Sequence, residues 1–154
     1  DKISKKTSNI IINANRNINT YEFYNYPVVK DVLENFQGPL AGIYSMLKFS
    51  KTDYLVTLPC DCPNFSWDVV QKLLEETDKT TDISIAHNTL RSQPVFMLVS
   101  KSLTKALHEF LKKGERKIDV WYQKNNYKYV YFDKELKYFD NINTIEQLNE
   151  YNSK

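Results

Sequence analysis

The sequence predicts an α/β fold with a mostly parallel sheet, helices on both faces and a small antiparallel addition. Short apolar runs, such as residues 9–14 and 54–58, alternate with longer stretches of helical periodicity. Short strand patterns near the C-terminus suggest that the antiparallel part is an added edge. The chain has 154 residues, 42% hydrophobic content and no linker or internal repeat, so we expect one domain over residues 1–154.

The composition argues against several kinds of partner and site. The 21 basic and 19 acidic side chains give a net charge of +2, which is too balanced for a nucleic-acid or membrane-surface binder. Cys60 and Cys62 have one residue between them, a spacing that suits neither a disulfide nor a zinc site. The sequence shows no signal peptide or long apolar run, so a cytoplasmic location is expected.

The first part of the chain predicts two strands and two helices. Residues 9–14 are β-branched and bounded by asparagines, as is typical of a buried parallel strand. The polar residues 13–16 that follow could be functional or could simply be loop punctuation. Residues 17–26 are expected to form a short helix, and residues 28–29 mark a second strand. Residues 38–47 predict a helix with proline in its first turn, where proline is well tolerated.

The rest of the chain continues this alternation. Residues 54–58 predict a strand, and a helix is expected to begin near Ser66. Thr144 and Gln147 have the spacing of a capping box at the start of a last helix. The remaining elements are expected as strands at 83–87, 94–99 and 127–132, a helix at 101–113 that ends at Gly114, and a helix at 118–122.

One carboxylate follows the strand at 54–58. Asp61 lies between Pro59 and Pro63, and proline fits poorly inside a central strand, so we expect Asp61 just past the strand's carboxyl end. Open α/β sheets bind their ligands at that edge. A single acidic group on a rigid corner suits Mg²⁺, which takes one or two protein carboxylates together with substrate phosphates. The alternative is that Asp61 merely caps the helix beginning near Ser66.

Other polar or glycine positions also have a structural alternative. Gly38 and Gly42 could let a ligand approach the amino end of a helix, or they could serve tight packing. Asn141 and Asn143 could bind a ligand, or they could form a polar turn before the last helix. Residues 114–117 could likewise be a helix terminator with solvated charges.

Taken together, these features resemble the molybdenum cofactor guanylyltransferases, which are relatives of the nucleotide-sugar pyrophosphorylases. Any one of the matching stretches is short, but they occur in the family's order. The stretches are Asn13-Ala14-Asn15-Arg16, Val29-Lys30-Asp31, Gly38-Pro39-Leu40-Ala41-Gly42, Pro59-Cys60-Asp61-Cys62-Pro63, Gln93-Pro94, Gly114-Glu115-Arg116-Lys117 and Asn141-Ile142-Asn143-Thr144.

The resemblance implies a three-layer, Rossmann-like nucleotidyltransferase fold. It also implies transfer of GMP from GTP to molybdopterin, with release of pyrophosphate and with Mg²⁺ as the metal. Asp61 would be the catalytic residue and metal ligand near the phosphates. The implied nucleotide contacts are Asn13, Asp31, Gly38, Gly42 and Asp61. The implied molybdopterin contacts are Arg91, Arg116, Lys117, Asn141 and Asn143.

The chain also departs from the family pattern. The family opens with a strand and a glycine-rich loop, followed by an arginine and a lysine that hold the triphosphate, and this sequence has no such segment. We expect the segment to be disordered or omitted rather than truly absent, because that strand is central and its loss would expose apolar neighbours. Gln93 stands where the family often has histidine, and we expect it to keep a hydrogen bond.

Two other functions stay open. One is a related nucleotidyltransferase that uses another nucleotide such as CTP, since base choice depends largely on the glycine-rich loop. The other is a non-catalytic protein that holds molybdopterin or a partner, such as a molybdoenzyme or another cofactor-assembly protein.

Overall fold

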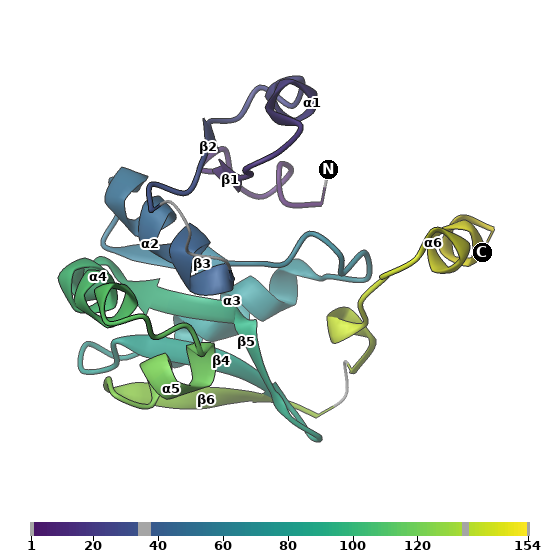
Figure 1. Ribbon diagram of the computed structural model, residues 1–154. Coiled ribbons are helices and arrows are strands. Elements are labelled where there is room, and N and C mark those ends of the chain that lie inside the picture. Colours follow the sequence, from purple (N-terminus) through teal and green to yellow (C-terminus); the bar gives the residue numbers. More distant parts are fainter. Residues whose placement is uncertain (1, 34–37, 134–135, 154) are drawn as a thin grey trace.

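A four-stranded sheet and a two-stranded sheet carry the fold in the computed structural model, which describes residues 2–33, 38–133 and 136–153 (Figure 1). The larger sheet has the strand order β3–β5–β4–β6, and the smaller one pairs β1 with β2. The strands are β1 (Ile12–Asn13), β2 (Val28–Val29), β3 (Tyr54–Thr57), β4 (Ile83–Asn88), β5 (Ser92–Ser100) and β6 (Tyr127–Phe132).

Helices follow the strands in the predicted alternation. Each predicted helix is present, and the sixth α-helix lies beyond the right-hand end of the larger sheet in Figure 1. The α-helices are α1 (Ile18–Glu22), α2 (Pro39–Phe49), α3 (Trp67–Glu76), α4 (Thr104–Lys112), α5 (Ile118–Tyr122) and α6 (Ile145–Asn152), with short 3₁₀ helices η1 (Lys101–Leu103) and η2 (Leu136–Phe139).

The direction of the strands is mixed, and the antiparallel strand lies inside the larger sheet. β6 runs parallel to β4, and β1 runs parallel to β2, whereas β5 is antiparallel to both β3 and β4. The expectation of an antiparallel edge near the C-terminus is therefore wrong in its placement. The physical reason is connection length: residues 89–91 alone join β4 to β5, and so short a turn can link only antiparallel strands.

A bulge explains how a proline fits into the central strand β5. On β4, Ile85 lies opposite Met97, but the next residue, Ala86, lies opposite Gln93. Residues 94–96 are therefore extra on β5, and Pro94 is one of them. A bulge interrupts the ladder locally, so the missing N–H of proline does not leave a neighbouring carbonyl without its regular partner.

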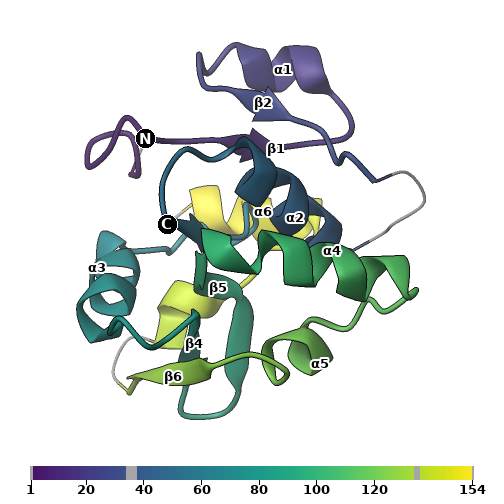
Figure 2. The same ribbon diagram turned by 90° about the vertical axis from the view of Figure 1, so that its left-hand side faces the viewer.

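The core has two parts, one on each face of the larger sheet. Helices lie on both sides of this sheet (Figure 2). Ile85 packs with α2, α4 and α5, including the fully buried Leu47 and Trp121. Its neighbour on β4, Ala86, packs on the opposite face with Val69 and other residues of α3. Side chains that alternate between the faces of a strand thus support a helical layer on each side, which confirms the predicted layers.

Residues predicted to start and stop helices do so. The Ser66 hydroxyl accepts the Asp68 N–H at the start of α3, and Gly114 follows α4 with a φ of 81°. At α6, Thr144 Oγ1 accepts the Gln147 N–H. Gln147 Oε1 in turn accepts the N–H of Asn143, the residue before the cap.

Within the described ranges, no helix has the length and apolar character needed to cross a membrane.

Candidate functional site

The carboxyl ends of β3, β4 and β6 meet at one edge of the larger sheet. β3 and β4 are both antiparallel to β5, so they run in the same direction, and β6 is parallel to β4. The segments that leave these three ends carry Asp61, Arg91 and Asn141. The topology therefore places three of the predicted site residues on the edge where such sheets bind ligands.

Asp61 lies four residues after the last residue of β3, Thr57, as the two prolines predicted. Its side chain is partly buried, and its Oδ2 accepts a hydrogen bond of 3.2 Å from Asn141 Nδ2. The main chains of the two segments are also joined, because the Ile142 N–H donates to the Asp61 carbonyl at 2.8 Å. Since Ser66 provides the cap of α3, the alternative that Asp61 caps this helix is wrong.

Cys62 completes this group of side chains. Its sulfur lies 3.4 Å from Asn141 Oδ1 and 3.8 Å from Asp61 Oδ1. Burial, followed by the negative charge of Asp61, raises the pKa of the Cys62 thiol to about 12. The thiol is therefore protonated at neutral pH and acts as a donor, and it is not a reactive thiolate.

The chemistry of Asp61 fits a hard divalent cation that shares its coordination with phosphates. Among the described residues, no group of three or more His, Cys, Asp or Glu side chains could hold a metal ion by itself. A lone carboxylate is nevertheless what Mg²⁺ uses when the substrate supplies the other oxygens. After burial, the negative charges of Asp61 and Asp140 are among the causes that raise the pKa of the neighbouring Cys62 thiol. Magnesium binding at Asp61 stays a prediction.

A second group of polar side chains forms where β1 and β2 end. Asn13 Nδ2 donates to the Val29 carbonyl at 3.0 Å and to Asp31 Oδ1 at 2.9 Å. Asn15 Nδ2 donates to the other carboxylate oxygen, Oδ2, at 2.9 Å, and Asn15 Oδ1 accepts the Asp31 N–H at 2.8 Å. The structure thus brings together Asn13 and Asp31, which the resemblance implied as nucleotide contacts.

Gly42 connects this polar group to α2. A Cβ atom added at Gly42 would lie 2.2 Å from Asn13 Oδ1 and 3.6 Å from Asp31 Oδ1. The glycine therefore allows the first turns of α2 to approach Asn13 closely, which is the packing alternative for this position. Gly38 differs: it precedes α2 with a φ of 125°, and no described residue comes within 4 Å of its would-be Cβ. Its predicted nucleotide contact stays a prediction.

Two residues of these groups were not predicted as site residues. Asn15 holds Asp31 as firmly as Asn13 does, and the signal for it was its place two residues after Asn13, which puts both side chains on one side of an extended segment. Cys62 was expected only to pack at a strand end. No sequence signal indicated that its sulfur reaches Asn141, because that contact joins residues far apart in the chain.

The remaining predicted residues, Arg91, Arg116, Lys117 and Asn143, are all exposed. Arg91 is exposed in the β4–β5 turn, where Asn88 Oδ1 accepts its N–H at 2.8 Å. Asn143 is exposed just before α6. Arg116 and Lys117 lie between α4 and α5, and Figure 1 shows α5 over the left half of the sheet and α6 beyond its right-hand end. The structure does not bring these two basic residues to Asn141, and their binding roles stay predictions.

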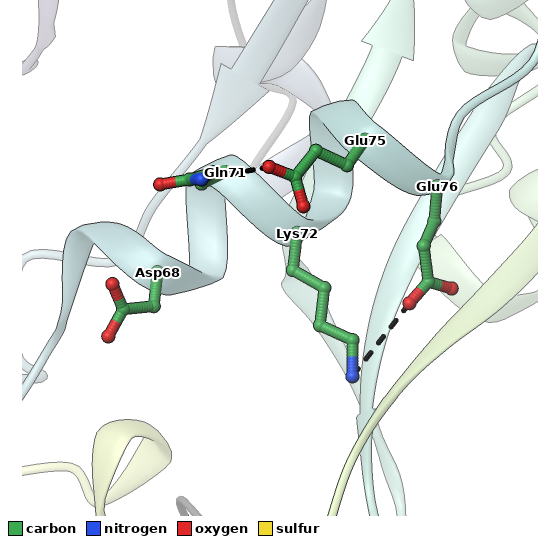
Figure 3. Close-up of a pocket in the computed structure, with 5 residues that line it drawn as sticks. All are labelled: Asp68, Gln71, Lys72, Glu75 and Glu76. Carbon is green, nitrogen blue, oxygen red and sulfur yellow. Dashed lines mark hydrogen bonds and ion pairs between the residues drawn. The ribbon is translucent and has the colours of Figure 1, made fainter.

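A shallow hollow on the outer surface of α3 is a separate feature (Figure 3). Its polar side chains pair with one another along the helix: Gln71 donates to Glu75, and Lys72 forms an ion pair with Glu76. Such pairs one turn apart are ordinary on exposed helix surfaces. The hollow therefore gives no reason to place a site on this helix.

The fold is the α/β fold of the nucleotidyltransferases, and solved structures share it. The crystal structure of a protein from Aquifex aeolicus VF5 is similar, with a TM-score of 0.81 and 26% identity over 93% of this chain and 75% of that one. The molybdopterin-guanine dinucleotide biosynthesis protein A of Archaeoglobus fulgidus shares the fold, with a TM-score of 0.74 and 23% identity over 96% of this chain and 80% of that one.

The family follows from the sequence comparisons. The family model of the MobA-like NTP transferase domain matches residues 2–126, and this chain belongs to that family. The molybdenum cofactor guanylyltransferase of Shewanella putrefaciens is 40% identical over 96% of this chain and 76% of its own length. The protein of the same name from Vibrio vulnificus is 40% identical over 98% of this chain and 77% of its own length. The predicted resemblance and fold class are confirmed.

Proposed function

We propose that the chain transfers GMP from GTP to molybdopterin and releases pyrophosphate, with Mg²⁺ held by Asp61. The observation that carries this proposal is the 40% identity, over 96% of the chain, to a protein named molybdenum cofactor guanylyltransferase. Family membership makes the chain a nucleotidyltransferase. The choice of GTP, of molybdopterin and of magnesium is the part that we propose.

The nucleotide would bind at the Asn13–Asp31 group. Guanine presents N–H donors on its Watson–Crick edge, and a carboxylate offers only acceptors. Among the described residues, each Asp31 oxygen accepts one amide hydrogen, from Asn13 or Asn15, and so has a second lone pair to offer a ligand. These amides fix the carboxylate in one orientation, so its remaining acceptor positions are ready before the base arrives.

The reacting phosphates would lie at the carboxyl edge, beside Asp61. The terminal phosphate of molybdopterin is already anionic at neutral pH, so it needs no general base to attack the α-phosphorus of GTP. Positioning and charge neutralisation dominate such reactions. A magnesium ion supplies positive charge that offsets the charge of the phosphate oxygens. The partly buried Asp61 would anchor it, and Asn141 would hold the carboxylate through the 3.2 Å hydrogen bond.

The acceptor would contact the segments around Asn141. Asn141, Asn143 and Arg91 are all exposed on segments that leave the carboxyl edge. Arg116 and Lys117 would need to approach this edge when the substrate binds, because the structure holds them near α5. Their guanidinium and ammonium groups are suited to the phosphate of the acceptor.

The direct test is a transfer assay. The purified full-length protein is incubated with Mg²⁺, molybdopterin and either GTP or CTP, and pyrophosphate and the dinucleotide product are measured by mass spectrometry. We expect the guanine dinucleotide and one pyrophosphate per product. Formation of only the cytosine dinucleotide would support the related transferase. Molybdopterin binding with neither product would support the non-catalytic binding protein.

Asp61→Ala should lower the rate of transfer by at least about a hundredfold while the protein stays folded, because charge stabilisation of the reacting phosphates is lost. The rate and the circular dichroism spectrum are compared with those of Asp53→Ala. Asp53 is an exposed carboxylate just before the opposite end of β3, so its replacement should leave the rate unchanged. Unchanged turnover of the Asp61 variant would remove this residue from the mechanism.

A further inference from the structure

We propose that Cys62 is a positioning residue that sets the orientation of the Asn141 side-chain amide. The consequence for catalysis rests on the function proposed above, but the orientation itself does not. Asn141 is exposed, and an exposed amide can rotate and exchange the places of its oxygen and nitrogen. If the amide nitrogen faces Asp61, it donates a hydrogen bond to the carboxylate. If the amide oxygen faces Asp61, the two groups repel each other.

The contacts select one orientation. Cys62 Sγ lies 3.4 Å from Asn141 Oδ1, and Asn141 Nδ2 lies 3.2 Å from Asp61 Oδ2. A thiol hydrogen can be donated to an amide oxygen but not to an amide N–H₂ group, which is itself a donor. The thiol therefore holds the oxygen on its own side and directs the nitrogen toward the carboxylate.

The position of the sulfur is itself fixed. Cys62 is only 5% exposed and packs in the hydrophobic cluster on the α3 face, with Phe65 and Phe96 among its members. The Ile142 N–H bond to the Asp61 carbonyl aligns the two segments that carry the thiol and the amide. A buried donor at a fixed place can orient an exposed partner, whereas a mobile surface group could not.

Asp61 alone would not keep this orientation during the reaction. Its carboxylate also attracts the amide nitrogen, but a cation on the same carboxylate competes for the oxygen that accepts the Asn141 hydrogen bond. The thiol has two acceptors within reach, Asn141 Oδ1 at 3.4 Å and Asp61 Oδ1 at 3.8 Å. A cation on the carboxylate takes up the second acceptor, so the nearer amide oxygen keeps the thiol hydrogen. Cys62 thus keeps the amide N–H₂ group pointing toward the reacting phosphates.

The test compares Cys62→Ala, which removes the donor, with Cys62→Ser, which keeps one, and with Cys60→Ala as the matched control. Cys60 is an exposed cysteine on the other side of Asp61. The first readout is the pair of Asn141 side-chain N–H signals in ¹H–¹⁵N spectra, assigned with Asn141→Asp and recorded with and without Mg²⁺. The second is the KM for molybdopterin and for GTP.

We expect Cys62→Ala to move the Asn141 signals toward those of a freely rotating asparagine. It should raise the KM for molybdopterin about fivefold and leave the KM for GTP within about twofold. Cys62→Ser should restore both readouts, and Cys60→Ala should change neither. In an Asn141→Ala background, Cys62→Ala should have no further effect on the KM for molybdopterin, because its partner is already gone.

Three results would overturn the proposal: unchanged Asn141 signals in Cys62→Ala, the same change in Cys60→Ala, or an undiminished KM effect in the Asn141→Ala background. A loss of folding would lower kcat for the whole preparation without a selective change in KM, so it is distinguishable. If the wild-type chain transfers no GMP, the proposed function fails, and the Asn141 signals still decide the orientation.

Discussion

Asp31 shows how single side chains prepare a binding group. Its carboxylate accepts hydrogen bonds from Asn13 at one oxygen and from Asn15 at the other, and its N–H donates to Asn15. Hydrogen bonds to a charged group are worth about 1.5–3 kcal/mol, more than those between neutral groups. The two asparagines thus hold the carboxylate in a single orientation before any ligand binds.

Asn15→Ala should weaken GTP binding about tenfold, because Asp31 loses one of its two amide donors and becomes free to rotate. Titration calorimetry with GTP in the presence of Mg²⁺ measures the dissociation constant. Asn9→Ala is the matched control, since Asn9 is exposed and lies ahead of β1. Equal affinities of the two variants would show that Asp31 does not depend on Asn15 for binding.

At the residue scale, the sequence predicted positions better than contacts. Asp61 could be placed past a strand end because two prolines enclose it, and Asn13 could be placed at the end of β1. The contact of Cys62 with Asn141 could not be predicted, because it depends on how the last segment of the chain returns to β3. The roles of the site residues stay predictions until they are measured.

The turn between α3 and β4 shows how one side chain stabilises a connection between elements. Asp78 Oδ1 accepts hydrogen bonds from the backbone and the hydroxyl groups of both Thr80 and Thr81. These bonds, led by that of the Thr80 hydroxyl, lower the pKa of Asp78 from 3.8 to about 2. They favour the ionised carboxylate, which only the folded turn can hold in this way.

Because the folded pKa of Asp78 is below its unfolded value, the turn should stabilise the fold fully above pH 4 and lose this contribution as the pH falls toward 2. Asp78→Asn cannot titrate, so its urea midpoint should fall less than that of the wild type between about pH 5 and pH 3. Thr80→Val loses the leading donor, so the fall of its urea midpoint should be intermediate between that of the wild type and that of Asp78→Asn. Parallel pH profiles of the wild type and Asp78→Asn would contradict this account.

At the scale of elements, the helices and their ends were predicted well because their signals are local. Ser66, Gly114 and Thr144 act within one turn of the helices that they bound. The direction of β5 was harder to predict, since it depends on the turn at 89–91 and on pairing with β3, which is distant in sequence. The bulge at Pro94 is likewise a property of two paired strands, and one strand's pattern does not reveal it.

At the scale of the molecule, the alternation of strands and helices in the sequence predicted the layers correctly. It predicted the positions of the binding groups only in part. Asp61, Arg91 and Asn141 all lie on segments that leave the carboxyl edge, because β3, β4 and β6 run in the same direction. Arg116 and Lys117 were expected with them, yet they belong to the connection between α4 and α5. Sequence order alone cannot tell where a loop between two helices lies.

The attachment of α6 has a consequence for how the protein responds to heat. None of its residues is buried, and its described links to the body include the Ile142–Asp61 bond and a 3.4 Å hydrogen bond from the Tyr151 hydroxyl to the Pro63 carbonyl. Warming should therefore detach this last helix, with Asn141, while both core clusters are still intact. We expect reversible inactivation several degrees below the melting of the sheet, visible as early hydrogen exchange in residues 145–152. Coincident inactivation and melting would show that the helix is held more firmly than its exposed side chains suggest.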